Sequence, residues 1–178
     1  MKVLHISYSY DFSDGGITTV VKQLIKEQRK TTIKVEWLAS NLFLYPFKRR
    51  KLFKEILKIN PTIVHIHGLW RVQTRITNDL LKAGFPYVIT PHGMLDKWAL
   101  NQSQLKKNIS WYLWEKKALE NSSFIQVLSS GELEYIKKIN SDWKCHLISN
   151  GIFMPSNKDL KLNAYPKCWE NKIPRNSN

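Results

Sequence analysis

The chain has 178 residues, about the size of one domain, and its 43% apolar and 24% charged residues exclude an intrinsically disordered protein. No apolar run approaches the roughly 18 residues of a membrane span, and the polar start at residues 1–7 predicts no secretory signal peptide. We therefore interpret Cys145 and Cys168, which share no metal-binding or redox spacing, as reduced cytosolic thiols. The net charge of +14 favours phosphate-bearing partners: nucleic acid, an anionic membrane surface or phosphorylated small molecules.

Apolar periodicity predicts an alternation of strands and helices along the chain. The predicted strands cover residues 2–7, 33–37, 62–66, 87–90, 124–128 and 146–148. The predicted helices cover residues 17–25, 48–59, 73–83, 105–120 and 132–139, with Asn60-Pro61 ending the second and Gly84 the third. In the helix at 105–120, the spacing predicts an inward face made by Leu105, Ile109, Tyr112, Leu113 and Leu119.

This alternation predicts an α/β fold with a single Rossmann-like, doubly wound parallel sheet and helices on both faces. The pattern stops after Phe153. We expect one domain over residues 1–153 and a poorly ordered linker or tail over 154–178, which is polar, aperiodic and proline-containing. Ligands of such sheets bind beyond the carboxyl ends of the strands, and three polar clusters of this sequence fall there.

The first cluster is Gly15-Gly16, between the first predicted strand and the first helix. Two glycines let a ligand approach the backbone, and a helix N-terminus offers free N–H groups to an anion. The pattern lacks the full GxGxxG of dinucleotide-binding proteins. A tight turn without a ligand therefore explains it equally well.

The second cluster is His65-Ile66-His67-Gly68-Leu69-Trp70. The period of a strand places His65 and His67 on one side, and His67, at the strand end, is expected to face the cleft. A metal site is one interpretation, but no carboxylate or third histidine follows at a suitable spacing. We therefore expect His65 to be a buried, hydrogen-bonded histidine. Trp70 either caps the core or stacks on a sugar.

The third cluster is Thr90-Pro91-His92-Gly93-Met94-Leu95, which places His92 just past a strand end. Such a histidine has either a structural role alone or a chemical one, as hydrogen-bond partner of a substrate hydroxyl or as acid or base near neutral pH. No Ser/His/Asp or Cys/His arrangement and no P-loop accompanies it in the sequence.

A basic cluster, Lys48-Arg49-Arg50-Lys51, lies beside the aromatic loop at residues 42–47 and is extended by Lys54 and Lys58. Cations beside aromatic side chains suit an anionic bilayer interface, and a solvated charged helix is the alternative. Nucleic-acid binding is the rival interpretation and the less favoured one, because no helix-turn-helix, zinc-finger or RRM signature accompanies the charge.

In their order and spacing these clusters resemble the N-terminal, acceptor-side half of family 4 retaining glycosyltransferases, which have the two-lobed GT-B fold. The resemblance covers about residues 1–155. It also rests on Trp98-Ala99-Leu100, on Trp111 and Glu115, on Ser129-Ser130 with Glu132, and on Ser149-Asn150-Gly151-Ile152.

The resemblance implies transfer of a sugar from a nucleotide-diphosphate donor to a glycan or lipid-linked acceptor, with retention, in polysaccharide or lipopolysaccharide biosynthesis. It implies that Gly15 and Gly16 approach the donor diphosphate, that His92 is catalytic, and that His67 and Trp70 bind the acceptor. It implies no cofactor and no metal, since helix N-termini and cationic side chains stabilise the leaving diphosphate. We expect a cytoplasmic protein, peripheral on the membrane through residues 48–51.

In the family a second lobe carries the residues that bind the donor, and their pattern is missing after Asn150-Gly151 in this sequence. We therefore expect this chain to supply the acceptor lobe and to be inactive until a partner chain with the donor lobe joins it. The alternative function is a non-enzymatic basic module that binds an anionic membrane surface or nucleic acid.

Overall fold

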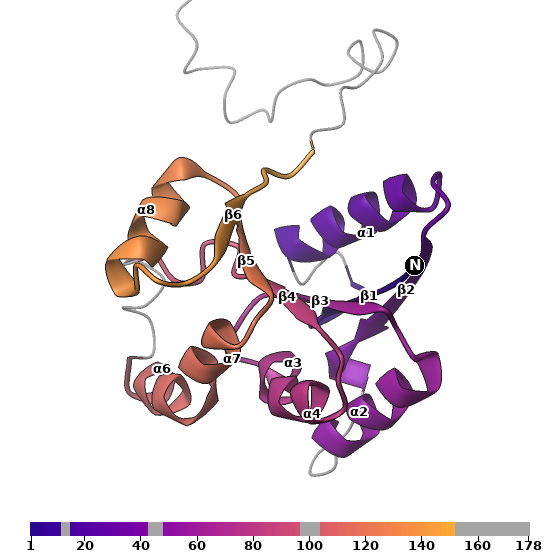
Figure 1. The fold of residues 1–178 in the computed structure, drawn as a ribbon, viewed down its shortest axis with the longest axis horizontal. Coiled ribbons are helices and arrows are strands. Elements are labelled where there is room, and N and C mark those ends of the chain that lie inside the picture. The colour runs from indigo at the N-terminus through magenta and orange to yellow at the C-terminus, as the bar shows by residue number, and fades with distance from the viewer. Residues whose placement is uncertain (12–14, 43–47, 97–103, 152–178) are drawn as a thin grey trace, which may run out of the picture.

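A sheet of six parallel strands forms the centre of this computed structural model, which describes residues 1–11, 15–42, 48–96 and 104–151 (Figure 1). The strands are β1 (Lys2–Ser7), β2 (Lys34–Ala39), β3 (Ile63–His67), β4 (Tyr87–Thr90), β5 (Phe124–Val127) and β6 (Cys145–Leu147). Their order in the sheet is β2-β1-β3-β4-β5-β6. The expected tail at residues 154–178, the aromatic side chains at 42–47 and Trp98-Ala99-Leu100 lie outside the described part of the chain.

Helices alternate with the strands, which confirms the predicted α/β fold with one parallel sheet. The helices are α1 (Gly16–Gln28), α2 (Lys48–Ile59), α3 (Val72–Arg75), α4 (Thr77–Lys82), α6 (Gln104–Ser110), α7 (Lys116–Glu120) and α8 (Ser130–Ile139), with a 3-10 turn η2 (Ser40–Leu42) and a π-helical segment η3 (Trp111–Glu115). The observed strand bounds agree with the predicted ones to within one or two residues, because the apolar pattern that predicts a strand lies within the strand itself.

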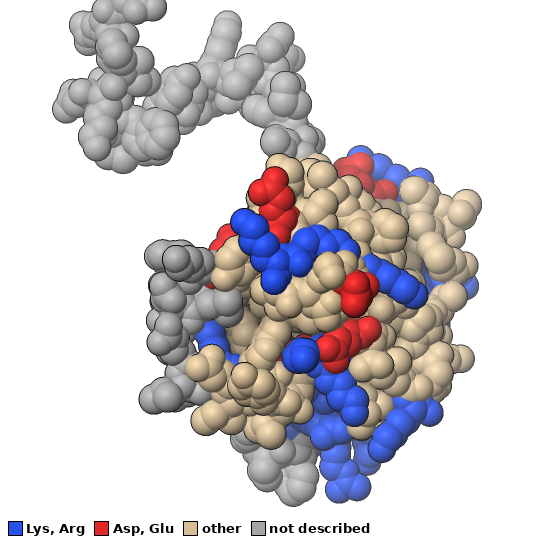
Figure 2. Space-filling model, turned by 60° about the vertical axis from the view of Figure 1, so that its left-hand side comes forward, with Lys and Arg blue, Asp and Glu red and all other residues tan. Residues whose placement is uncertain are grey.

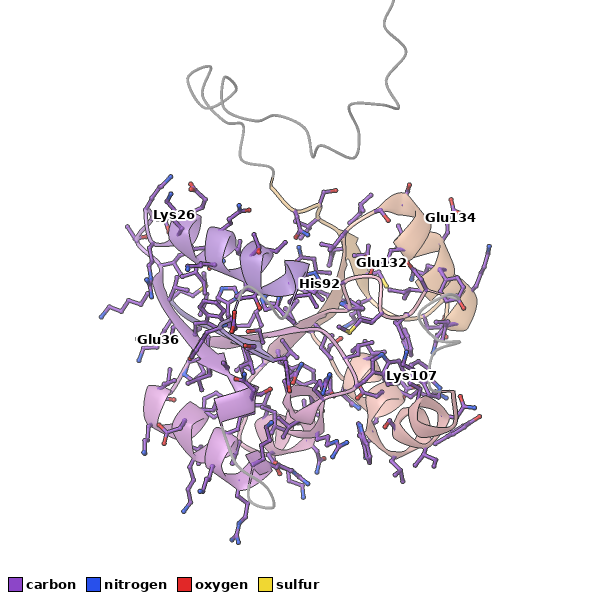
Figure 3. All side chains as sticks on the ribbon, turned by 180° about the vertical axis from the view of Figure 1, so that it is seen from behind. Lys26, Glu36, His92, Lys107, Glu132 and Glu134 are labelled. Carbon is purple, nitrogen blue, oxygen red and sulfur yellow. The ribbon has the colours of Figure 1, made fainter. Side chains whose placement is uncertain are left out.

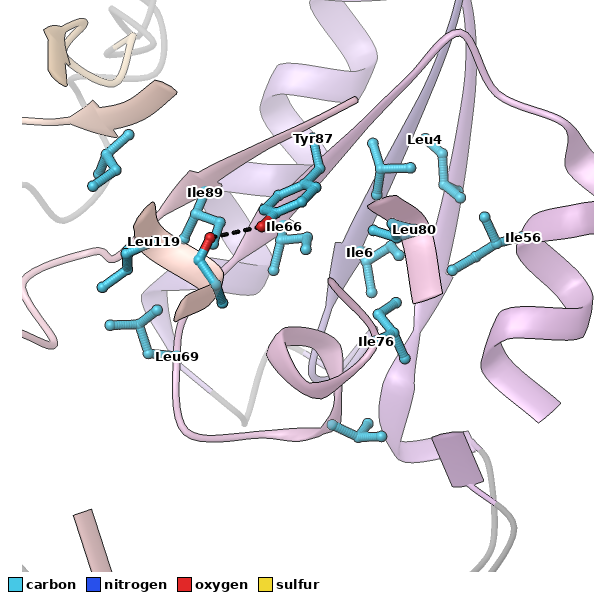
Figure 4. Close-up of a cluster of buried hydrophobic side chains, with 14 of the residues drawn as sticks. Leu4, Ile6, Ile56, Ile66, Leu69, Ile76, Leu80, Tyr87, Ile89 and Leu119 are labelled. Carbon is cyan, nitrogen blue, oxygen red and sulfur yellow. Dashed lines mark hydrogen bonds between the residues drawn. The ribbon is translucent and has the colours of Figure 1, made fainter. Parts of the chain in front are cut away.

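The main core lies between the sheet and the layer of α2, α3, α4 and α7, which Figure 1 shows on the opposite side of the sheet from α1. The strands contribute apolar residues such as Leu4, Ile6 and Ile89 to it, as Figure 4 shows. The buried Tyr87 hydroxyl donates a hydrogen bond of 2.8 Å to the carbonyl of Ala118 and so joins the sheet to α7. A smaller cluster of Val21, Ile25 and Val35 lies under α1.

The two faces of the sheet are unequally covered by the described helices. The chain passes from β1 to β2 in one direction along the sheet and makes every later crossover in the other, so right-handed connections put α1 alone on its face. Ile136 of α8 packs with Ile125 and Val127 on the opposite face. Beside α1 a groove of about 1040 Å³ remains, lined at its base by β-strand residues and at its end by Asn150 and Gly151.

The helix predicted over residues 73–83 is broken at Ile76 into α3 and α4. The Thr77 hydroxyl donates to the carbonyl of Thr74, and the single proton of the Thr74 hydroxyl is shared between the carbonyl of Arg71 and the carboxyl group of Glu115. Such bonds compete with the helical ladder and explain the break. The helix ends at Gly84, as predicted, with φ of +77°.

The helix predicted over residues 105–120 contains the π-helical segment η3, in which the N–H of Lys116 bonds to the carbonyl of Trp111, five residues back. The wider turn changes which side chains face the sheet. The predicted inward positions of Ile109, Tyr112 and Leu113 are therefore wrong: these side chains are exposed, Tyr112 by 83%. Leu119 is buried as predicted, and the side chain of Leu105 lies outside the described residues.

Candidate functional site

On the face that α1 covers, the strands carry polar side chains toward their carboxyl ends. The register pairs His5 of β1 with His65 of β3, and His67 of β3 with Thr90 of β4. Residues paired between parallel strands point to the same face, so these four side chains meet there. The sequence pattern thus places His65 and His67 on one side correctly, at 4.0 Å between ring centroids.

Four of the chain's five histidines belong to this cluster, and three of them form a hydrogen-bonded chain with Gln28 of α1. Nε2 of His5 lies 2.7 Å from Oε1 of Gln28, and Nδ1 of His5 lies 2.9 Å from Nε2 of His67. Nδ1 of His67 lies 3.1 Å from Nε2 of His92. His67 is buried and uses both ring nitrogens, so it supports His92 instead of facing the cleft as its place at the strand end suggested.

His65 belongs to a second, shorter chain of hydrogen bonds. Its Nε2 lies 2.7 Å from the hydroxyl of Thr90, which donates to Oε1 of Gln126 at 3.3 Å. The side-chain amide of Gln126 in turn donates to the carbonyl of Ile148 at 2.9 Å. His65 is hydrogen-bonded, as expected, but it is only half-buried, because it lines the groove beside α1.

Burial keeps the clustered imidazoles neutral at pH 7. Loss of solvation lowers the pKa of His5, and it holds the pKa values of His65 and His67 well below the usual range, with a further contribution from the neighbouring histidines. Burial also lowers the pKa of His92 to about 4. Of the two chemical roles considered for His92, this favours a hydrogen bond to a substrate hydroxyl over proton exchange near neutral pH.

The loop that holds His92 is a tight turn with two consecutive left-handed residues. His92 has φ of +55° and Gly93 has φ of +72°, and the N–H of Met94 donates to the carbonyl of Pro91. Two positive φ values in the centre of a four-residue turn are typical of type I′. A left-handed histidine is strained, so the surrounding structure must hold it there.

Glu132, near the start of α8, holds this turn in place. Its Oε1 accepts a hydrogen bond of 2.8 Å from the N–H of Gly93, and its Oε2 accepts one of 2.7 Å from the N–H of Leu128. The hydroxyl of Ser129 caps α8 by accepting a hydrogen bond from the N–H of Glu132. Figure 3 shows Glu132 pointing inward near His92, whereas Glu134 of the same helix points away.

Trp70 follows His67 in a loop that is anchored by Glu115 of the π-helical segment. Trp70 has φ of +65°, and its backbone N–H donates to Oε1 of Glu115 at 3.0 Å. Its ring packs against the main core, 6.3 Å from the ring of Trp111, as in the core-capping alternative. Its indole N–H is buried and has no hydrogen-bond partner among the described residues.

Gly15 and Gly16 lie at the N-terminus of α1, at the carboxyl edge of the sheet, where His92 also lies. Gly15 has φ of +106°, which a residue with a Cβ rarely adopts, and no heavy atom of the other described residues lies within 4 Å of a Cβ added at either glycine. Both are exposed. The backbone is therefore open to a close ligand, which the sequence pattern alone could not establish.

The basic cluster at residues 48–51 forms the first turn of α2. Arg49 makes two hydrogen bonds of 2.7 Å to the carboxylate of Asp79, so part of its charge is neutralised. Arg50 and Lys51 are exposed and have no ion pair with any described residue. Within the described ranges, no helix has the length and hydropathy needed to cross a membrane.

In the described part of the chain, His5, His65 and His67 also form a group that could hold a metal ion. One ring nitrogen of each lies within 4.8 Å of one from each of the others. No third histidine follows the pair at a suitable spacing in the sequence, but β1 lies beside β3 and brings His5 to them in the fold. His5 and His67 are already within hydrogen-bond distance of each other, and the expectation of no metal stays a prediction.

Sequence reasoning found His67 and His92 but missed Gln28 and His5, which complete their chain of hydrogen bonds. The missing information was the strand order, since only a sheet in which β1 neighbours β3 brings His5 beside His67. Glu132 was noted only as part of a motif. Its contact with Gly93 joins positions 39 residues apart, which no local pattern reports.

The comparison with known families covers the part of the chain that carries most of the candidate site. The family model for Glycosyltransferase Family 4 matches residues 37–153, which include His67, His92, Glu115 and Glu132. No curated protein matches the chain.

Proposed function

The chain belongs to glycosyltransferase family 4, and on this premise we propose that it takes part in sugar transfer from a nucleotide-diphosphate donor to a glycan or lipid-linked acceptor, with retention at the anomeric carbon. The observation that carries the proposal is His92: a neutral histidine, held in a strained turn at the carboxyl edge of the sheet, inside the matched region. A strained polar residue at that edge is typical of a binding or catalytic site.

In this proposal His92 is the catalytic residue and contacts a hydroxyl of the donor sugar near the reacting centre. The open backbone at Gly15 and Gly16 approaches the donor diphosphate, and the free N–H groups of α1 stabilise its charge. Trp70 lines the acceptor side, while His67 acts from behind His92. No metal is required, because backbone N–H groups and cations stabilise the leaving group.

We further propose that this chain provides the acceptor-side domain, that a donor lobe on a partner chain completes the enzyme, and that the protein is cytoplasmic. The exposed Arg50 and Lys51 support a peripheral membrane association, which suits a lipid-linked acceptor in polysaccharide or lipopolysaccharide biosynthesis. If the enzyme alternative fails, the same cations support a non-enzymatic module that binds an anionic surface.

The first test is calorimetric titration of the purified chain with a panel of UDP- and GDP-sugars. Absence of binding supports an acceptor-side domain, whereas micromolar binding would place a donor site on this chain. Transfer is then assayed with a family 4 donor lobe co-expressed. His92→Ala is expected to lower transfer by at least about 10²-fold, as loss of a positioned hydrogen-bonding group does. The control is His146→Ala, which removes an exposed histidine of β6. Equal activity of both variants would remove His92 from the site.

A further inference from the structure

In the hydrogen-bonded chain of Gln28, His5, His67 and His92, the chemistry of Gln28 sets the direction in which each hydrogen bond is donated. In the orientation that the structure gives the Gln28 amide, its carbonyl oxygen Oε1 faces His5 and only accepts, so Nε2 of His5 carries the proton of this hydrogen bond. A neutral imidazole has a single N–H, which leaves Nδ1 of His5 as an acceptor. Nε2 of His67 therefore donates to His5.

The rings of His67 and His92 continue this direction to the end of the hydrogen-bonded chain. Because Nε2 of His67 holds the only proton of that ring, Nδ1 of His67 accepts, and Nε2 of His92 donates to it. Nδ1 of His92 is then left with a lone pair. It makes no hydrogen bond with any described residue, so the last acceptor of the chain is available to a ligand.

The burial of the rings keeps this direction intact. His5 is 0% and His67 is 2% exposed, so water does not compete for their nitrogens. A second proton on either ring would put an unpaired charge in the interior, which is costly. Each ring therefore exchanges one tautomer for the other only if its neighbours do the same.

We propose that Gln28, His5 and His67 are positioning residues that lock His92 in its Nε2–H tautomer, so that His92 offers Nδ1 as a hydrogen-bond acceptor at the edge of the sheet. The consequence is specificity. A hydroxyl group can donate to this nitrogen, whereas an ionised phosphate oxygen has no proton to give and is repelled by the lone pair. We rely on the proposed function only for the identity of the hydroxyl group, which would belong to a sugar.

The test is a two-bond proton–nitrogen NMR correlation on the full chain labelled with ¹⁵N in its histidines, near pH 7 and without substrate. Each neutral ring then shows one protonated and one unprotonated nitrogen, which identifies its tautomer. We expect Nε2–H in His5, His67 and His92. The exposed His146, which takes no part in the hydrogen-bonded chain of histidines, provides an internal reference. An Nδ1–H tautomer in any of the three would overturn the proposal.

Substitution of Gln28 tests whether the direction is transmitted. Gln28→Glu keeps a pure acceptor and is expected to leave all three tautomers unchanged. Gln28→Lys replaces the acceptor with a donor. It is expected to convert most His92 side chains to the Nδ1–H tautomer, because the change passes from Gln28 through His5 and His67 to His92. Gln23→Lys, on the same helix and in the same groove, adds the same charge without touching His5 and is expected to change none.

Two results would contradict the proposal independently of any sugar transfer. One is a Gln28→Lys protein in which His92 keeps its tautomer. The other is stoichiometric binding of Zn²⁺ to the chain with loss on His5→Gln, which would assign these nitrogens to a metal. Because tautomers are read without substrate, a failure of the proposed function leaves this test unaffected.

Discussion

Glu115 is a fully buried carboxyl group whose chemistry is set by its immediate neighbours. Its Oε1 accepts hydrogen bonds from the N–H of Trp70, the hydroxyl of Thr74 and the indole of Trp114. Its Oε2 has no partner among the described residues. Burial outweighs these hydrogen bonds and raises the pKa of Glu115 from 4.5 to about 7.

This shift predicts that stability falls as pH rises from about 4.5 to about 7. A carboxyl with a raised pKa keeps its proton in the folded state at pH values where the unfolded chain has lost it, so each rise in pH within that window favours unfolding. Glu115→Gln keeps the acceptor oxygen and cannot ionise. We therefore expect the free energy of unfolding, measured by urea denaturation across this range, to depend less on pH in the variant.

The matched control for this measurement is Glu134→Gln, which removes an exposed carboxylate of α8. It is expected to keep the pH dependence of the parent chain. If Glu115→Gln kept it as well, the burial of Glu115 would not be the source of the effect.

At the scale of elements, local periodicity predicted the strands and the ends of α2 and α4 but not the course of the chain between α6 and α7. Turn and helix-end signals are local, since Asn60 and Gly84 adopt the left-handed conformation that ends a helix. A π-helical turn depends on a bond from Lys116 to Trp111 that apolar spacing does not report. The same holds for the candidate site. The position of His92 just after a strand can be read from the sequence, whereas His5 and Glu132 reach the site only through the fold.

Because of the π-helical segment, we expect truncation of two leucines in this stretch to change the free energy of unfolding by very different amounts. Leu113→Ala removes a side chain that is 62% exposed, and we expect it to change the free energy of unfolding by less than about 0.5 kcal/mol. Leu119→Ala empties a buried position of the main core and is expected to cost about 2–5 kcal/mol. Urea denaturation of the two variants decides this, and equal costs would favour a regular helix through residues 105–120.

The link between α8 and the turn of His92 is tested through backbone amides. Glu132→Ala leaves the partly buried N–H groups of Gly93 and Leu128 without their acceptor, and an unsatisfied donor of this kind costs about 1–3 kcal/mol. We expect hydrogen exchange at Gly93 to become at least about tenfold faster, since 1.4 kcal/mol corresponds to a factor of ten. Glu134→Ala, on the exposed side of α8, is expected to leave that rate unchanged. An unchanged rate in Glu132→Ala would mean that other contacts hold the turn.

Across the whole molecule the excess positive charge is unevenly neutralised. Several cations pair with acids, among them Lys30 with Glu27 and Arg49 with Asp79. Figure 2 shows blue side chains at the lower edge of the molecule with no red ones among them. The first turn of α2, with Arg50 and Lys51, follows the carboxyl end of β2 and so lies toward the edge of the sheet that holds His92. A surface docked there would bring its lipid-linked groups near the candidate site.

This arrangement predicts that Arg50→Gln combined with Lys51→Gln weakens binding to vesicles containing phosphatidylglycerol. Each cation near an anionic surface contributes about 1 kcal/mol, so two correspond to a loss of roughly thirtyfold in the partition coefficient, measured by sedimentation at low salt. The control, Lys34→Gln combined with Lys144→Gln, removes the same charge at the amino-terminal edge of the sheet, where β2 and β6 begin. Equal losses in both double variants would indicate a diffuse effect of net charge. Strong, salt-sensitive binding to duplex DNA without vesicle binding would favour nucleic acid as the partner.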